Sequence, residues 1–418
     1  MVSKLVALLV IVLGVVALAQ LIRVYELSSK IRRKGEHEIN SRDNNLNAKM
    51  LLGFMIAFYA GFIYLMLNYG WTGRGEAASV HGKETDWLLD LNFIIIIIVF
   101  FLTNTLLFGF AYKYVKKPGV PALYYPHNNK LEMLWTVVPA IVLAVIIILG
   151  LKSWNEATAD ANQEAIRVEL FSKQFDWTAR YAGQDNQLGK FDYKLTTDNN
   201  ELALVTAETI DSAIVNMENG PTGIKALSMK LNDASIMLVP EEEAKMKADL
   251  YRKERLVRLL YQMKAHHNKK NDAMAWDDII QKDTLYLCEG KEYEFNFRSK
   301  DVIHSAFFPH FRAQMNTVPG LTTRFKFIPD ITTKDMRVKQ NNDAFNFVLM
   351  CNKICGGAHY KMKMIVVVLS PSEYKSWMAS KANQTFKDKY FVAAPVATEE
   401  VAAPAETGSE VAAMPAAN

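Results

Sequence analysis

Four apolar stretches constrain this chain more than any other feature of its sequence. They lie near residues 5–22, 50–67, 91–112 and 133–151. Each is about long enough to cross the roughly 30 Å hydrocarbon core of a bilayer as a helix. In lipid the backbone must satisfy its own hydrogen bonds, which a lone strand cannot do, so even the isoleucine run at 94–98 is expected to be helical. The sequence therefore predicts a transmembrane region over residues 1–154.

The overall composition hides this region. A mean hydropathy of −0.00 and a hydrophobic content of 50% would suit an ordinary soluble protein, because apolar spans and a polar remainder cancel in the average. The 3 cysteines are too few for a disulfide-stapled scaffold. A net charge of +4 on 418 residues gives no electrostatic case for a nucleic-acid partner.

Basic residues in the linkers predict the orientation of the four spans. Linkers 23–49 and 113–132 are rich in lysine and arginine, whereas linker 68–90 holds only Arg74 and Lys83. The positive-inside tendency then places the first and third linkers in the cytoplasm and everything after Trp154 outside. A cleaved signal at the first span would leave the large C-terminal region in the cytoplasm, so we expect an uncleaved first helix.

An external domain is predicted over residues 155–390. Seven short segments, most with apolar and polar residues alternating, are expected to be strands of a small β-sandwich or barrel. They are Arg167–Phe171, Phe175–Tyr181, Leu285–Leu287, Glu292–Phe297, Arg324–Ile328, Phe345–Leu349 and Ile365–Leu369.

A partly helical insertion, residues 185–282, is expected to interrupt this domain. Pro240 and the three glutamates after it predict a helix start. Its apolar stripe is expected to lie against the β-domain or to dock a neighbouring subunit; the stripe consists of Met246, Leu250, Val257, Leu260 and Met263. The Ala-, Pro- and Glu-rich residues 391–418 are expected to be a flexible tail.

The pattern Cys351-x3-Cys355-x3-His359-x2-Met362 is the strongest chemical signal in the chain. Two thiolates, an imidazole and a thioether form a soft ligand set that suits copper, and zinc would favour Cys or His over the methionine. A mononuclear blue-copper site needs one thiolate, so the second cysteine favours a pair of bridged coppers. His304, at the end of a predicted strand, supplies the second imidazole that a dinuclear site needs.

These residues resemble subunit II of the bacterial heme–copper cytochrome c oxidases, whose dinuclear copper (CuA) domain is a cupredoxin-like β-barrel carried by a membrane hairpin. The matching segments are Asp301–Ser305, Val318–Gly320, the loop from Cys351 to Met362, Glu132–Pro139 and Gln174–Trp177. The hairpin corresponds to the third and fourth spans. Residues 1–70, with two extra helices, and the insertion fall outside the resemblance.

The resemblance implies a role for each ligand. Cys351 and Cys355 would bridge two coppers, and His304 and His359 would each bind one. Met362 would be a weak ligand, and the backbone carbonyl of Lys353 would complete the set. Cys288 has no ligand partner and is expected to be a core residue, and adjacent His266 and His267 point to different helix faces, which disfavours a metal role.

Three positions bear on the family's other sites. Lys353 stands where the family has a glutamate that helps to hold magnesium at the interface with subunit I, so a magnesium site is doubtful. Phe175 occupies the position where the family has the tryptophan through which electrons enter, and Trp177 keeps the aromatic residue that neighbours it. Glu132 stands at the mouth of a proton-uptake channel, although a solvated acid capping a helix explains it equally well.

The predicted function is electron transfer within a terminal oxidase of the bacterial inner membrane. The copper pair, on the periplasmic face, would take electrons from cytochrome c, or from a cytochrome c domain of a partner complex. It would pass them to the heme of subunit I, where oxygen is reduced and protons are pumped. The alternatives are a copper-delivery module and a copper-free structural subunit of the quinol-oxidase type.

Overall fold

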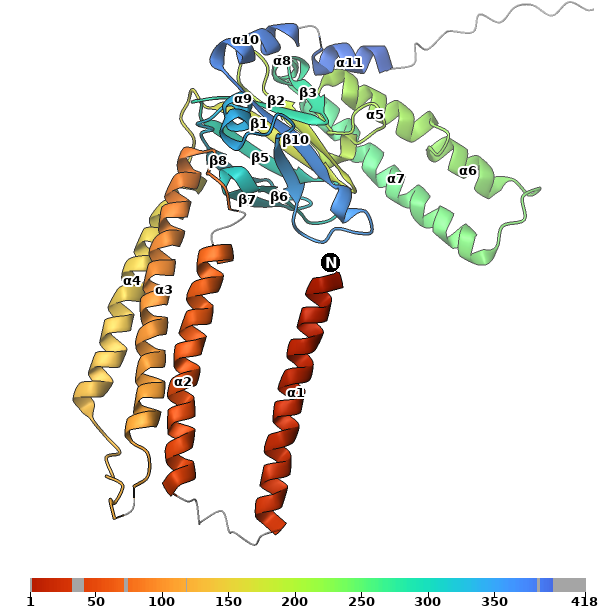
Figure 1. The fold of residues 1–418 in the computed structure, drawn as a ribbon. Coiled ribbons are helices and arrows are strands. Elements are labelled where there is room, and N and C mark those ends of the chain that lie inside the picture. The colour runs from red at the N-terminus through yellow and green to blue at the C-terminus, as the bar shows by residue number, and fades with distance from the viewer. Residues whose placement is uncertain (1, 32–40, 71–73, 118, 382–383, 394–418) are drawn as a thin grey trace, which may run out of the picture. The chain divides into compact units, whose positions relative to one another are not determined.

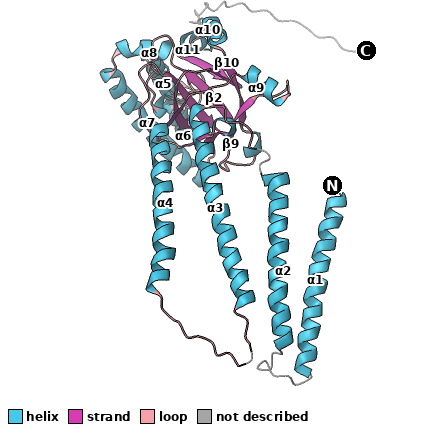
Figure 2. Ribbon diagram, turned by 60° about the vertical axis from the view of Figure 1, so that its left-hand side comes forward, coloured by secondary structure: helices cyan, strands magenta, loops and turns pink. Residues whose placement is uncertain are grey.

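Two compact units make up the chain. The computed structural model describes residues 2–31, 41–70, 74–117, 119–381 and 384–393. One unit comprises residues 1–76 and 86–151, and the other comprises 77–85 and 152–418. Figure 2, with helices in cyan and strands in magenta, shows that the strands gather in the second unit.

The elements follow one another along the chain as labelled in Figure 1. The helices are α1 (Val2–Ile31), α2 (Ser41–Leu65), α3 (Val80–Lys113), α4 (Asn129–Thr158), α5 (Ala207–Asn219), α6 (Ile224–Asn232), α7 (Pro240–His266), α8 (Asp272–Trp276), α9 (Thr333–Gln340), α10 (Pro371–Ser380) and α11 (Phe386–Ala393). The strands are β1 (Ile166–Lys173), β2 (Asp176–Tyr181), β3 (Ile279–Lys282), β4 (Thr284–Cys288), β5 (Tyr293–Ser299), β6 (His304–Phe308), β7 (Ala313–Thr317), β8 (Thr323–Phe327), β9 (Phe347–Cys351) and β10 (Lys363–Leu369).

The four predicted membrane helices are confirmed. Helices α1 to α4 are each long and apolar enough to cross a bilayer. Within the first unit, α2 and α3 contact through aromatic side chains, and the Tyr59 hydroxyl donates to the carbonyl of Phe101 over 3.0 Å. A polar bond of this kind gives two apolar helices a fixed rotation where the hydrophobic effect offers none.

The first turn of α3 and the residues before it belong to the second unit. The Ala78 N–H donates to the carbonyl of His310 (2.8 Å), and the Ser79 hydroxyl donates to that of Phe311 (2.8 Å). Ser79 also forms a β-bridge with Pro329. These residues lie outside the predicted external domain, 155–390, whose boundaries stay a prediction. A chain cut at residue 155 would lose these bonds.

Two five-stranded sheets form the β-domain, which confirms the predicted cupredoxin-like fold class. Their strand orders are β3-β2-β1-β5-β8 and β4-β10-β9-β6-β7, with parallel pairs β1–β5 and β4–β10. All seven predicted strands are present, and β3, β6 and β7 were not foreseen. Strand β7, Ala-Gln-Met-Asn-Thr, lacks a run of β-branched or aromatic residues, so its pairing with β6 decides its structure.

The core lies between the two sheets and is largely aromatic. Its fully buried rings come from both sheets and from the turn between β6 and β7: Trp177, Tyr181, Tyr293, Phe295, Phe297, Phe308, Phe311 and Phe347. Aromatic side chains bury large areas with few rotatable bonds, so they contribute much of the stability of such a core. The ligand-bearing strands β6 and β9 are therefore held by rigid packing.

The insertion between β2 and β3 holds a helical lobe with a core of its own, which corrects the expectation for α7. Leu260 of α7 is fully buried against α5 residues Ile210, Ala213 and Ile214, and Met263 packs beside them. The C-terminal part of the stripe, Leu260 and Met263, therefore packs against α5 rather than the β-domain. Sequence periodicity located this face but could not identify its partner. Of the predicted tail 391–418, residues 394–418 lie outside the described part of the chain.

Buried charges tie the insertion to the sheet. Arg180 of β2 pairs with its cross-strand neighbour Glu169 and with Asp278, and it donates to the carbonyl of Gly189. Arg298 of β5 pairs with Glu169 and donates to the carbonyl of Leu202. Both arginines thus bond an inserted loop to a central strand, and each buried charge has an opposite partner.

Replacing Arg180 with methionine should destabilise the protein by about 3–5 kcal/mol, since Asp278 would remain buried without a counter-charge and Glu169 would keep only Arg298. Urea unfolding of the full chain in detergent, followed by tryptophan fluorescence, measures the loss. Lys247→Met, which removes an exposed pair with Glu243, is the control and should change stability by no more than about 0.5 kcal/mol. Equal stability of the two variants would contradict a structural role for the buried cluster.

Candidate metal centre

The cysteine loop is the connection between β9 and β10. These antiparallel strands place Met350 opposite Lys363. The next bond along closes the loop, because the Cys351 N–H donates to the carbonyl of Met362 over 3.0 Å. Cys351 and Met362 therefore face each other across its base. The intervening residues, with a short helical turn at His359–Lys361, return the chain over this base.

His304 reaches the same place from β6. The register pairs Ala306 of β6 with Cys351 of β9, so the first residue of β6 lies beside the loop. The prediction that His304 ends a strand was wrong, because His304 is the first residue of β6. Its side chain has no exposed surface, and its Nδ1 lies 4.0 Å from the Cys351 Sγ. Strand pairing thus joins ligands that lie 47 positions apart in sequence.

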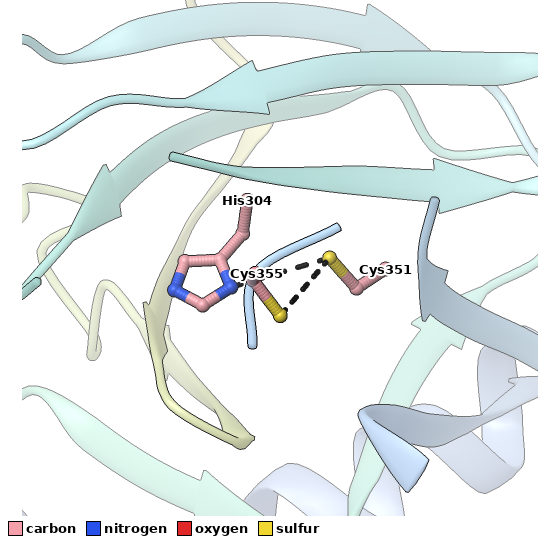
Figure 3. Close-up of side chains that lie close together, drawn as sticks. All are labelled: His304, Cys351 and Cys355. Carbon is pink, nitrogen blue, oxygen red and sulfur yellow. Dashed lines mark hydrogen bonds between the residues drawn. The ribbon is translucent and has the colours of Figure 1, made fainter. Parts of the chain in front are cut away.

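The structure brings all six predicted ligands together. Figure 3 shows His304, Cys351 and Cys355 turned toward one another, with their ligand atoms within 4.8 Å. The two Sγ atoms are 3.9 Å apart. The Cys355 Sγ lies 3.5 Å from the His359 Nδ1 and 3.8 Å from the Met362 Sδ. The Cys351 thiol donates to the Lys353 carbonyl over 3.1 Å. Their role as metal ligands stays a prediction.

The donor set fits a soft metal. Two sulfurs 3.9 Å apart can both bind one ion, because a metal–thiolate bond is about 2.3 Å long. Two thiolates, two imidazoles, a thioether and a carbonyl supply more donors than one tetrahedral ion uses. Sulfur and imidazole ligands together are typical of copper sites. The residues present therefore fit a copper pair.

Burial shapes the chemistry of the thiols. Burial and the neighbouring Cys351 raise the pKa of the Cys355 thiol to about 11. Without a metal, Cys355 is thus a protonated thiol at neutral pH, and a bound metal would displace its proton. The three described cysteines are free. Cys288, as expected, lies in the core without a ligand beside it, and burial raises the pKa of its thiol.

The two aromatic candidates for electron entry differ in exposure. Trp177 is fully buried, with its ring edge-on to His304 at 6.3 Å between centroids, so a donor protein cannot contact it directly. Phe175 is half-buried beside the loop. A Cβ added to Gly356 would lie 2.9 Å from the Phe175 Cζ, so these two segments are in close contact.

The other predicted positions have separate environments. The Glu132 carboxylate accepts the N–H of Asn128 over 3.4 Å in the first turn of α4, which is a helix-capping bond. His267 pairs with Asp272 at 2.6 Å, and His266 contacts the carbonyl of Gln262, so neither joins the metal ligands. The Lys353 side chain is exposed.

Two residues at the centre were not assigned a role from sequence. Asp301 lies 2.9 Å from the His304 Nε2, and the Gln174 side chain donates to the carbonyl of Cys355. Burial raises the pKa of Asp301, but hydrogen bonds from His304 and from the N–H groups of Gln174 and Val302 outweigh it, so the pKa is lowered. The sequence signal for the role of Asp301 was its position three residues before a predicted ligand histidine, since carboxylates often orient such histidines.

The chain is similar in sequence to proteins of one known family. Residues 71–153 match the model of the family described as cytochrome C oxidase subunit II, transmembrane domain. The match includes the segment Glu132–Pro139 and begins after α1 and α2. The family model thus covers the third and fourth membrane helices, as the resemblance implied.

Curated relatives carry related names. The chain is 24% identical over 333 residues to the alternative cytochrome c oxidase subunit 2 of Bradyrhizobium diazoefficiens, covering 79% of this chain and 91% of that protein. It is 32% identical over 102 residues to cytochrome c oxidase subunit 2 of Thermostichus vulcanus, covering 24% and 27%. The predicted resemblance is confirmed by these matches.

A solved structure is also similar. It is the periplasmic domain of subunit II of cytochrome oxidase (CoxB) of Bradyrhizobium japonicum. The identity is 13% and the TM-score is 0.25, with 53% of this chain and 96% of that chain covered.

Mild oxidation of the metal-free chain should join Cys351 to Cys355 and leave Cys288 reduced, because only the first two thiols lie side by side. Thiol titration under denaturing conditions should fall from 3 free thiols to one, and peptide mass spectrometry should identify the bridge. A Cys355→Ser chain, as control, should keep both remaining thiols. Oxidation that leaves Cys351 and Cys355 as free thiols would contradict the close approach of their sulfur atoms.

Proposed function

Because the chain is a relative of cytochrome c oxidase subunit II, we propose that it transfers electrons within a membrane-bound terminal oxidase. One observation carries the proposal: strand pairing gathers His304 and the ligands of the 351–362 loop into one cluster. This donor set suits a redox-active copper pair better than a structural zinc ion. The oxygen chemistry would take place in subunit I.

Each ligand has a distinct task in this proposal. Cys351 and Cys355 would bridge the two coppers, and His304 and His359 would each hold one. Met362 and the Lys353 carbonyl would complete the set. The copper pair would accept and release one electron at a time. Burial of His304 and both cysteines excludes water, and the packed strands beneath keep the ligands from moving as the charge changes.

Electrons would enter from cytochrome c, or from a cytochrome c domain of a partner complex, on the periplasmic face of the bacterial inner membrane. Phe175 is the better entry candidate because it combines partial exposure with contact at Gly356. Trp177 would act behind it, between the surface and His304. Proton pumping would belong to the assembled oxidase rather than to this chain alone.

The interface with subunit I would differ from that of the family in one respect. Lys353 offers an exposed ammonium where a magnesium-binding carboxylate is expected. An ammonium group cannot coordinate a cation. We therefore propose that this position does not contribute to a magnesium site, while its carbonyl still faces the Cys351 sulfur.

Loading the full chain with copper in detergent tests the proposal. We expect a purple product with two coppers per chain and an electron paramagnetic resonance signal split by both copper nuclei. Cys288→Ser should leave the signal unchanged, since Cys288 lies apart from the ligands, whereas Cys351→Ser should abolish it. A colourless product would favour a delivery module or a copper-free subunit, and a blue single-copper spectrum would equally contradict the proposal.

Replacing Glu132 with glutamine separates its two possible roles. Glutamine can still accept the Asn128 N–H, so the helix cap survives while the negative charge is lost. A proton-channel role predicts several-fold slower turnover and proton uptake by the assembled oxidase, measured in vesicles. Glu156→Gln, which removes an exposed pair with Lys152 on the same helix, is the control and should have no effect. Wild-type rates for Glu132→Gln would leave only the capping role.

A further inference from the structure

One carboxylate joins two separate segments at the candidate metal centre. Asp301, in the loop between β5 and β6, lies with its Oδ1 2.9 Å from the His304 Nε2. Its Oδ2 accepts the backbone N–H of Gln174 over 2.7 Å, in the turn between β1 and β2. The Val302 N–H also donates to Oδ1 over 2.7 Å. Asp301 is therefore held on both oxygens.

This contact selects the ring nitrogen that His304 can offer to a metal. An ionised carboxylate only accepts hydrogen bonds, so the nitrogen that faces it, Nε2, carries the proton. The lone pair is then on Nδ1, which faces the Cys351 Sγ at 4.0 Å. Asp301 thus fixes both the tautomer and the rotation of the ring, as carboxylates behind metal-bound histidines commonly do.

Gln174 extends the link to the cysteine loop. Its side-chain N–H donates to the carbonyl of Cys355 over 2.5 Å. The loop passes so close that a Cβ on Gly356 would lie 2.9 Å from the Gln174 Nε2, and Gly356 has a φ of +142° that disfavours other residues. The β1–β2 turn is therefore bonded to Cys355 through a side chain and to Asp301 through its backbone.

The second imidazole has no comparable support. His359 is half-buried, and its ring contacts the Cys355 Sγ at 3.5 Å. Among the described residues, no carboxylate bonds to its ring. The two halves of the centre thus differ: His304 is buried and held by Asp301, whereas His359 depends on the loop alone.

We propose that Asp301 and Gln174 are positioning residues that lock His304 and Cys355 into one rigid frame with the β1–β2 turn. This inference rests on the proposed function and goes beyond it by assigning these two residues. The same turn carries Phe175, the entry candidate, so electron entry and metal ligands share one hydrogen-bonded unit. Rigid ligands require little rearrangement when the centre gains or loses an electron.

Variants of the full chain, loaded with copper in detergent, test the frame. Asp301→Ala should release copper to a chelator about 10–100-fold faster. It should also shift the reduction potential and the copper hyperfine splitting. Asp301→Asn should show smaller shifts in the same direction, because its amide oxygen can still accept from the ring. Asp343→Asn, an exposed aspartate on the loop before β9, is the matched control and should behave as wild type.

Gln174→Ala should shift the same signals less than Asp301→Ala, and Gln340→Ala, at the exposed end of α9, is its control. Both residues act through one frame. The increase in the rate of copper release in the double variant should therefore be smaller than the product of the increases in the two single variants. A purely structural role would lower stability without moving the potential or the splitting. If Asp301→Ala keeps the wild-type reduction potential and hyperfine splitting, the inference is overturned. A wild-type chain without a copper-pair signal would contradict the proposed function instead.

A second measurement needs no copper. In the metal-free chain with ¹⁵N-labelled histidine, nuclear magnetic resonance should find His304 protonated on Nε2, and Asp301→Ala should give a mixture of tautomers. His304 protonated on Nδ1 in the wild-type chain would overturn the inference even if the Asp301 variants fail to load copper.

Discussion

The pairing of β6 with β9 is the constraint on which the candidate metal centre depends. It places Ala306 opposite Cys351, and this register alone brings His304 to the cysteine loop. A slip of one residue would turn His304 to the other face of its sheet, since side chains alternate along a strand. The aromatic core between the two sheets fixes that register, so the ligand geometry is a property of the whole β-domain.

Local patterns in the sequence predicted much of this structure. Long apolar runs identified the four membrane helices, and alternation identified seven strands, because both signals lie within single elements. The cysteine loop was recognisable for the same reason, since four of its ligands fall within one short segment. The need for a second imidazole pointed to His304, and the resemblance to subunit II then added the Lys353 carbonyl to the predicted ligand set.

What the sequence did not reveal depends on contacts between distant segments. Strand β7 owes its structure to its partner β6, and Leu260 and Met263 of α7 pack against α5 rather than a surface outside the insertion. The role of Asp301 requires the turn at Gln174, which is 127 positions away in sequence. The segment at Ser79 joins the β-domain although it precedes a membrane helix. Such pairings have no periodic signal, so only the fold discloses them.

Copper K-edge X-ray absorption on the loaded full chain would test the copper pair itself, because it reports the neighbours of copper without reference to colour or activity. We expect two thiolate sulfur neighbours for each copper, together with scattering from a second copper at bonding range. Copper with a single sulfur neighbour, or without another copper beside it, would contradict the assignment of Cys351 and Cys355 as bridging ligands.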